Sequence, residues 1–109
     1  MKLFLDDVRT VSESTHGTEW KEWLLVGTVD ECKRLLDTGD VTHISLDYDL
    51  SYSDYAHTGM DVIEYIGDKM LADPTYKLPV IYIHSVHDKA RKMWERVNAL
   101  QAMQKIREG

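Results

Sequence analysis

The feature that most constrains the fold of this chain is a pair of short apolar runs that each end abruptly in acidic residues. Residues 43–50 read HISLDYDL, and residues 2–7 read KLFLDD. Runs of this length are typical of buried β-strands, and the charges at their ends would then lie at the edge of a sheet. Parallel strands end at the same edge, so two such neighbours would bring four carboxylates together there.

Further apolar runs alternate with helical patterns along the chain. Strands are expected at residues 3–5, 24–26, 41–46 and 78–83. Residues 9–19 are polar and follow neither the strand nor the helix period, so we expect a loop there.

Three helices are expected between and after these strands. Capping boxes at residues 28–31 and 58–61 predict two helix starts. Gly39 is expected to end the first helix, and the Asp73-Pro74 pair the second. The apolar spacing from about Asp88 onward predicts a long amphipathic closing helix.

Nearly continuous apolar strands separated by helices are typical of a parallel sheet covered on both faces. With right-handed crossovers, the pattern predicts a single α/β domain over residues 1–109, a three-layer sandwich of the flavodoxin type. Its mostly parallel four-stranded sheet would have the order 2-1-3-4. Ligands of such folds bind at the switch point, which here lies between the first and third strands.

Three strand ends place charged or polar side chains at that rim: Asp6-Asp7, Asp47 with Asp49, and His84-Ser85. Carboxylates packed this closely repel one another unless protons or a cation neutralise them. Because Mg²⁺ prefers oxygen ligands and keeps several waters, two or three aspartates suffice to hold it. We therefore predict a metal site, although any one of these aspartates alone is about as readily explained as a turn cap.

The segment His84-Ser85-Val86-His87 places two imidazoles and a hydroxyl beside the predicted acid cluster. The Ser85 hydroxyl can bind a phosphoryl oxygen, and a histidine can protonate a leaving alkoxide. Two plainer interpretations compete: a strand-end histidine that is merely hydrogen-bonded, and Ser85 as the cap of the following helix, toward Asp88.

The charge is unevenly distributed. Residues 88–109 hold six Lys or Arg and three acids, a net charge of +3, whereas the whole chain carries -6, so the rest sums to -9. The negative total argues against broad nucleic-acid binding. The basic segment is interpreted as a solvated helix face, with a phosphate-contacting face as the alternative. The acidic remainder suits a divalent cation.

Cellular context and aromatic residues add weaker indications. Cys32 is the only cysteine, which excludes an internal disulfide and fits a reducing compartment. No apolar segment approaches membrane-spanning length, so we expect a cytoplasmic protein without membrane contact. Trp20, Trp23 and Tyr48 can stack on bases, but packing in a core or lid is the favoured interpretation. No pattern indicates an oligomeric state.

Several motifs together resemble the cyclic-phosphate processing receiver-like domain, a degenerate relative of the response-regulator receiver. They are Leu5-Asp6-Asp7-Val8-Arg9, Ser45-Leu46-Asp47-Tyr48-Asp49-Leu50, Thr58-Gly59-Met60-Asp61, and His84-Ser85 followed by Met93. The resemblance implies that Asp6 and Asp7 are the metal-binding acid pair, that Asp47 occupies the phosphoacceptor position, and that Ser85 is the hydroxyl residue after the fourth strand.

The chain also departs from an ordinary receiver. No strand is expected after Ile83, so the fifth strand with its invariant lysine, and the fifth helix, are missing. The polar residues 9–19 stand where the first receiver helix would be. Without that lysine, phosphorelay signalling is disfavoured, and hydrolysis fits the residues better.

The hypothesis that follows is a metal-dependent phosphoesterase acting on cyclic phosphates of nucleotides or RNA ends. Mg²⁺ or Mn²⁺ would be held by Asp6, Asp7 and Asp47. Catalytic candidates are Asp47 as a direct nucleophile, Asp49, His84, Ser85 and His87, and candidates for substrate contact are Arg9, His57, Thr58 and Gly59.

Two alternatives stay open. The first is a non-catalytic receiver-like phospho-switch or protein-interaction module. The second is a haloacid-dehalogenase-like phosphatase, suggested by the D-x-D-x-[ST] pattern at residues 47–51. The second ranks last, because too few residues follow His84 to supply the lysine and acidic pair that those enzymes need.

Overall fold

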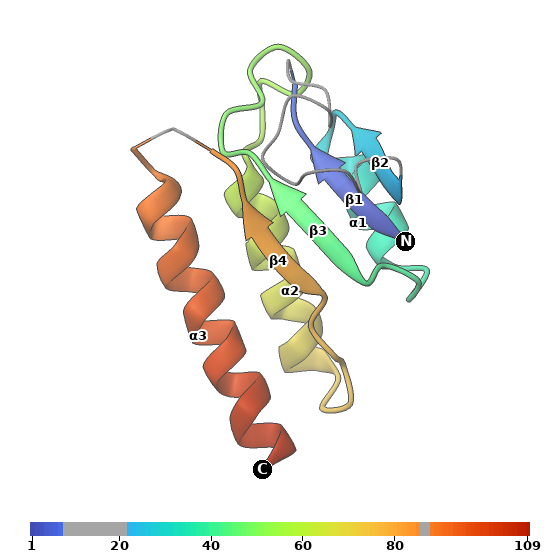
Figure 1. The fold of residues 1–109 in the computed structure, drawn as a ribbon, viewed down its shortest axis with the longest axis vertical. Helices are drawn as coiled ribbons and strands as arrows, with labels where there is room; N and C mark the ends of the chain where they lie inside the picture. The colour runs from blue at the N-terminus through green and yellow to red at the C-terminus, as the bar shows by residue number, and fades with distance from the viewer. Residues whose placement is uncertain (8–21, 86–87) are drawn as a thin grey trace.

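The structure, a computed structural model, describes residues 1–7, 22–85 and 88–109 (Figure 1). The predicted loop at 9–19 and Trp20 lie outside the described residues. In chain order the elements are β1 Lys2–Leu5, β2 Trp23–Val26, α1 Val29–Leu36, β3 His43–Leu46, α2 Gly59–Ala72, β4 Val80–Ile83 and α3 Ala90–Glu108.

The four strands form one parallel sheet in the order β2-β1-β3-β4. The predicted α/β receiver-like fold with strand order 2-1-3-4 is confirmed, and the described residues contain no fifth strand. Backbone hydrogen bonds continue past the strand ends. The amide of Asp47 donates to the Leu5 carbonyl at 3.0 Å, and the amide of His84 donates to the Leu46 carbonyl at 3.0 Å. These bonds hold the polar residues that follow β1, β3 and β4 side by side.

Both capped helices start where the sequence predicts. The Thr28 hydroxyl accepts from the Glu31 amide at 3.2 Å, and the Asp61 carboxylate accepts from the Thr58 amide at 2.9 Å. After α1, Gly39 takes the left-handed conformation, with φ of 80°. No helix in the described part of the chain is long and apolar enough to cross a membrane.

Two strands are shorter than predicted, because they begin at His43 and Val80 rather than at residues 41 and 78. Pro79 has no amide hydrogen, so the ladder of β4 starts only at Val80, whose amide donates to the Thr42 carbonyl at 2.9 Å.

All three helices pack on one face of the sheet. Leu3, Leu5, Ile44, Leu46 and Ile81 point to this face, where they form a single core cluster with side chains of the helices. The helical contributions are Val29, Cys32 and Leu36 of α1; Val62, Ile63, Ile66 and Met70 of α2; and Met93, Val97 and Leu100 of α3. In Figure 1, α1 and α2 lie behind the sheet.

The prediction that helices cover both faces is wrong for the described residues, and β4 shows the consequence. Its apolar run alternates in exposure: Ile81 is buried on the helical side, whereas Val80 is 47 % and Tyr82 38 % exposed on the other. A continuous apolar run therefore did not mean burial on both faces here.

Aromatic packing covers part of this second face. The Trp23 indole makes edge-to-face contacts with Phe4, His43 and Tyr82, with centroid distances of 6.5, 6.3 and 6.1 Å. Trp23 thus reaches from β2 across the sheet toward β4, as the packing interpretation requires. Tyr48 also packs, against the core cluster on the helical side.

The loop between β3 and α2 is fastened to the start of α1 by Asp54. One oxygen of its carboxylate, Oδ2, accepts from the Val29 amide at 2.9 Å, and the other, Oδ1, pairs with His57 Nδ1 at 2.8 Å. The Ser53 hydroxyl donates to the Gly27 carbonyl. A carboxylate at a helix N-terminus is stabilised by the exposed amides and by the helix dipole, so this pair ties the loop to α1.

The Asp54–His57 pair predicts a pH-dependent contribution to stability. The hydrogen bond to Asp54 raises the pKa of His57 above its usual 6.5. Burial raises the pKa of Asp54, but the Val29 amide and His57 outweigh it and leave that pKa lowered. A raised histidine pKa contributes stability that is fully present below pH 6.5 and is lost as the pH rises through the folded-state value.

We therefore expect His57→Gln to lower the free energy of unfolding more at pH 5.5 than at pH 9, as measured by urea denaturation. In an Asp54→Asn background the same substitution should show a smaller difference between the two pH values, because only the weaker effects of Asp61 and Asp30 then raise the pKa of His57. An equal loss at both pH values would contradict the assignment.

Candidate functional site

Asp6, Asp47 and His84 follow β1, β3 and β4 and meet at the carboxyl edge of the sheet. Each offers one ligand atom, and these three atoms lie within 4.8 Å of one another. Asp6 is 3 % and Asp47 7 % exposed. Two carboxylates at this level of burial are costly unless a cation or protons balance their charge.

One geometric rule explains why these three side chains meet. Successive residues of a strand point to opposite faces, and the alternation continues just past the strand ends. Asp6 lies two residues after Phe4, Asp47 two after Ser45, and His84 two after Tyr82. Phe4 and Ser45 are register partners, as are Ser45 and Tyr82. All three site residues therefore belong to the face of the sheet without described helices.

His84 is fixed on both of its nitrogens and on one ring face. Its Nε2 lies 2.9 Å from Asp6 Oδ2, and its Nδ1 lies 2.7 Å from the Ser45 hydroxyl. The ring stacks on Phe4 with a centroid distance of 4.2 Å and an interplanar angle of 8°. Only 4 % of the side chain is exposed. The imidazole is therefore held rigidly against the acids.

Two residues that hold His84 in place, Ser45 and Phe4, were not among the predicted site residues. Ser45 is fully buried in the middle of the apolar run Ile44-Ser45-Leu46. A hydroxyl at such a position needs a partner, because burying it without one is unfavourable. The serine was thus a readable signal that a polar side chain lay opposite it.

Asp7 does not join the three-residue group. Its Oδ2 atom accepts from the Tyr52 amide at 3.0 Å, so its carboxylate helps to hold the loop after β3. The alternation rule gives the reason, since the residue after Asp6 points to the opposite face. Of the acids predicted to bind metal, the structure brings Asp6 and Asp47 together, with His84 beside them.

The other candidates are distributed around this group. Asp49 is exposed, and its Oδ1 atom accepts from the Ser51 amide at 2.9 Å. Ser85 is half-buried directly after His84, and it does not occupy the N-cap of α3, which is Lys89. Arg9 and His87 lie outside the described residues.

Thr58 and Gly59 lie beside the backbone that follows β3, whereas His57 pairs with Asp54. Thr58 forms an isolated antiparallel bridge with Asp49, and the Gly59 amide donates to the Tyr48 carbonyl at 3.0 Å. A Cβ atom at Gly59 would overlap the Asp47 carbonyl oxygen. Only glycine therefore lets α2 begin this close to the strand end that carries Asp47.

The donor set fits a divalent cation. Ligands of one ion at about 2.1 Å lie at most about 4.2 Å apart, so small side-chain rotations would close the group around it. Carboxylates suit Mg²⁺ and Mn²⁺, whereas imidazole is a ligand of softer transition metals. The mixed set of two carboxylates and one imidazole favours Mn²⁺ over Mg²⁺ when His84 takes part.

Comparison with known protein families identifies a match. The family model of the cyclic-phosphate processing receiver domain matches residues 1–99. No curated protein and no solved structure matches the chain. The matched range includes Asp6, Asp47 and His84, and so covers all three residues of the group at the sheet edge.

The close approach of Gly59 to Asp47 generates a stability prediction. Gly59→Ala should lower the free energy of unfolding by about 1–3 kcal/mol, because the backbone must move to admit the methyl group. The matched control is Gly67→Ala in the same helix, where the added Cβ would meet Leu100 at 3.4 Å. There the better helix propensity of alanine should leave stability unchanged or raised by up to about 1 kcal/mol.

Urea denaturation of both variants provides the comparison. If Gly59→Ala were as stable as Gly67→Ala, the close approach of α2 to Asp47 would be refuted.

Proposed function

The chain belongs to the cyclic-phosphate processing receiver domain family, and we propose that it is a metal-dependent phosphoesterase that hydrolyses cyclic phosphates. The proposed substrates are 2′,3′-cyclic phosphates of nucleotides or RNA ends. The observation that carries the proposal is the buried group of Asp6, Asp47 and His84, whose ligand atoms lie within 4.8 Å of one another at the carboxyl edge of the sheet.

In this proposal Asp6 and Asp47 hold Mn²⁺ or Mg²⁺, with His84 as a third ligand for Mn²⁺. When bound, the ion supplies Lewis acidity toward a phosphoryl oxygen and lowers the pKa of a bound water. The protein's part is to keep two carboxylates and an imidazole in place before the substrate arrives. The interactions of His84 with Asp6, Ser45 and Phe4 support such preorganisation.

The contacts of His84 favour a ligand or positioning role over proton transfer to substrate. Both ring nitrogens are within hydrogen-bond distance of protein oxygens, and the side chain is almost fully buried. When Nε2 faces the ion, Nδ1 carries the proton and donates to Ser45, a partner that fixes the tautomer. A proton for the leaving oxygen would then come from another group.

Hydrolysis forms a bond from a water oxygen to phosphorus and breaks one ring P–O bond, whose oxygen takes up a proton. The exposed carboxylate of Asp49, two residues after Asp47, is the proposed base. Direct attack by Asp47 is the alternative first step. The hydroxyls of Ser85 and Thr58 are proposed to contact phosphate oxygens. The Gly59 amide already donates to the Tyr48 carbonyl, so the substrate contact predicted for Gly59 is not part of this proposal. Roles for Asp7, Arg9, His57 and His87 stay predictions from the sequence.

An assay of the purified protein tests the activity. With Mn²⁺ and 2′,3′-cyclic AMP, ³¹P NMR should show conversion of the cyclic phosphate to a phosphomonoester, and EDTA should stop it. Asp47→Asn should remove turnover, whereas the matched change Asp68→Asn, at an exposed acid of α2, should leave it unchanged. Turnover by the Asp47→Asn protein equal to that of the unmodified chain, or none by either across several cyclic phosphates, would sink the proposal.

Rapid labelling of Asp47 by acetyl phosphate, without turnover of any cyclic phosphate, would instead favour the receiver-like phospho-switch. The phospho-switch is compatible with the position of Asp47 directly after β3, because the resemblance to receivers places Asp47 at the phosphoacceptor position.

The hydrogen bond between Ser45 and His84 predicts a loss of metal affinity. Ser45→Ala should weaken Mn²⁺ binding roughly 10–100-fold, the usual cost of removing a partner that orients a histidine ligand. Electron paramagnetic resonance of free Mn²⁺ measures the affinity, and circular dichroism verifies that the variant is folded. The control is Ser51→Ala at an exposed serine. Unchanged Mn²⁺ affinity in folded Ser45→Ala would remove His84 from the proposed ligands.

A further inference from the structure

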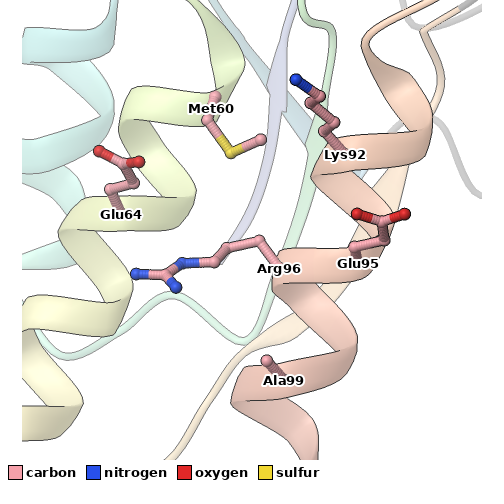
Figure 2. A pocket seen from close by; sticks show the side chains of 6 residues that line it. All are labelled: Met60, Glu64, Lys92, Glu95, Arg96 and Ala99. Atoms are coloured by element: carbon pink, nitrogen blue, oxygen red, sulfur yellow. The ribbon is translucent and has the colours of Figure 1, made fainter.

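A groove between α2 and α3 lies apart from the group at the sheet edge. It has a volume of about 460 Å³ and is lined by Met60, Glu64, Lys92, Glu95, Arg96 and Ala99 (Figure 2). Met60 is the second residue of α2 and Lys92 the third of α3. The groove therefore begins near the N-terminal ends of both helices, and α2 starts against Asp47.

Two cations of α3 face this groove. Lys92 and Arg96 are four residues apart, so they lie on the same side of the helix. Within the described part of the chain, neither makes a hydrogen bond or an ion pair. In Figure 2, Arg96 extends from α3 toward α2, and Lys92 extends toward the top of the view. Both charges are thus available to a ligand.

Only one of the two acids in the lining faces this pair. Glu95 pairs with Arg91, with 3.6 Å between Oε1 and Nε. Figure 2 shows the Glu95 carboxylate on the side of α3 away from α2. The formal charges of the lining residues sum to zero, but with Glu95 turned toward Arg91 the acid that faces the two cations is the exposed Glu64 of α2.

The first turn of α3 has an unfavourable charge for a helix start. The first turns of the other helices carry acids, Asp30 and Glu31 in α1 and Asp61 in α2, whereas that of α3 has none. Instead α3 begins with Arg91 and Lys92 near its positive end, where the helix dipole disfavours cations. Charges placed against local stability commonly mark function, and a bound anion would compensate them.

We propose that this groove binds the phosphate group of a nucleotide-sized ligand, with Lys92 and Arg96 as the residues that hold it. The side chains of Met60 and Ala99 offer apolar contact to the sugar or base. The volume lies within the range of small-molecule sites. The phosphate belongs either to a separate nucleotide or, resting on the proposed function, to the next nucleotide of a strand whose cyclic end occupies the sheet edge.

Binding is tested without metal, so that the outcome does not depend on the proposed activity. In EDTA, the methyl resonance of ¹³C-labelled Met60 should shift saturably when 5′-AMP is added, and that of buried Met70 should not. Lys92→Gln and Arg96→Gln should each weaken binding about two- to fivefold, as expected of exposed charge pairs, and added salt should weaken it further.

Lys105→Gln, which removes the same charge from the last turn of α3, is the matched control and should leave the affinity unchanged. The proposal would be overturned if uncharged adenosine bound as tightly as AMP. It would also be overturned if the affinity for AMP were the same in Lys92→Gln and Arg96→Gln as in the unmodified protein. No shift of Met60 at millimolar AMP would also overturn it.

A second pair of substrates identifies the source of the phosphate. With Mn²⁺, Lys92→Gln and Arg96→Gln should raise the KM of a dinucleotide that ends in a 2′,3′-cyclic phosphate, and leave that of the cyclic mononucleotide unchanged. If neither KM changes, the groove serves a separate nucleotide. If no substrate turns over, the proposed function fails, and the measurement in EDTA still decides whether the groove binds phosphate.

Discussion

The candidate site depends on the parallel pairing of β1 with β3. Register places Leu5 opposite Leu46, and the Asp47 amide continues the ladder by donating to the Leu5 carbonyl. The next residue of each strand is an aspartate, and both are almost fully buried. Two carboxylates in that position repel and are poorly solvated, so the fold creates a demand for positive charge at this edge. The contact of His84 Nε2 with Asp6 Oδ2 at 2.9 Å offsets part of this cost, and a divalent cation would offset more of it.

Much of this arrangement could be predicted from the sequence, because strand ends in a parallel sheet share one edge. The strand order followed from the alternation of strands with helices and from right-handed crossovers. Once that order makes β1 and β3 neighbours, the shared edge brings Asp6 and Asp47 together. That Asp7 does not join Asp6 and Asp47 could also have been predicted, because consecutive residues of a strand point to opposite faces. The link from Ser45 to His84 was not, because it joins residues 39 apart whose contact depends on register and rotamer. The prediction that helices cover both faces of the sheet was wrong at β4, where the apolar run is buried on one side only.

A single helical layer has consequences for the site. Asp6, Asp47 and His84 lie on the face where the described part of the chain places no helix, and Trp23 covers part of that face by edge-to-face packing. The helical face holds the main core, and its helices start near the same edge of the sheet. Charge is divided accordingly, with acids at the strand ends and cations along the first turns of α3. Such a division would let a metal and a phosphate-bearing ligand occupy neighbouring regions without competing for the same residues.

The central claim is that Asp6, Asp47 and His84 share one divalent cation. Its most direct test is anomalous diffraction from a crystal of the protein soaked in Mn²⁺. We expect one strong peak at about 2.2 Å from a carboxylate oxygen of Asp6 and of Asp47, with the imidazole Nε2 of His84 at a similar distance. A fully occupied peak elsewhere, or none at this edge at millimolar Mn²⁺, would contradict it.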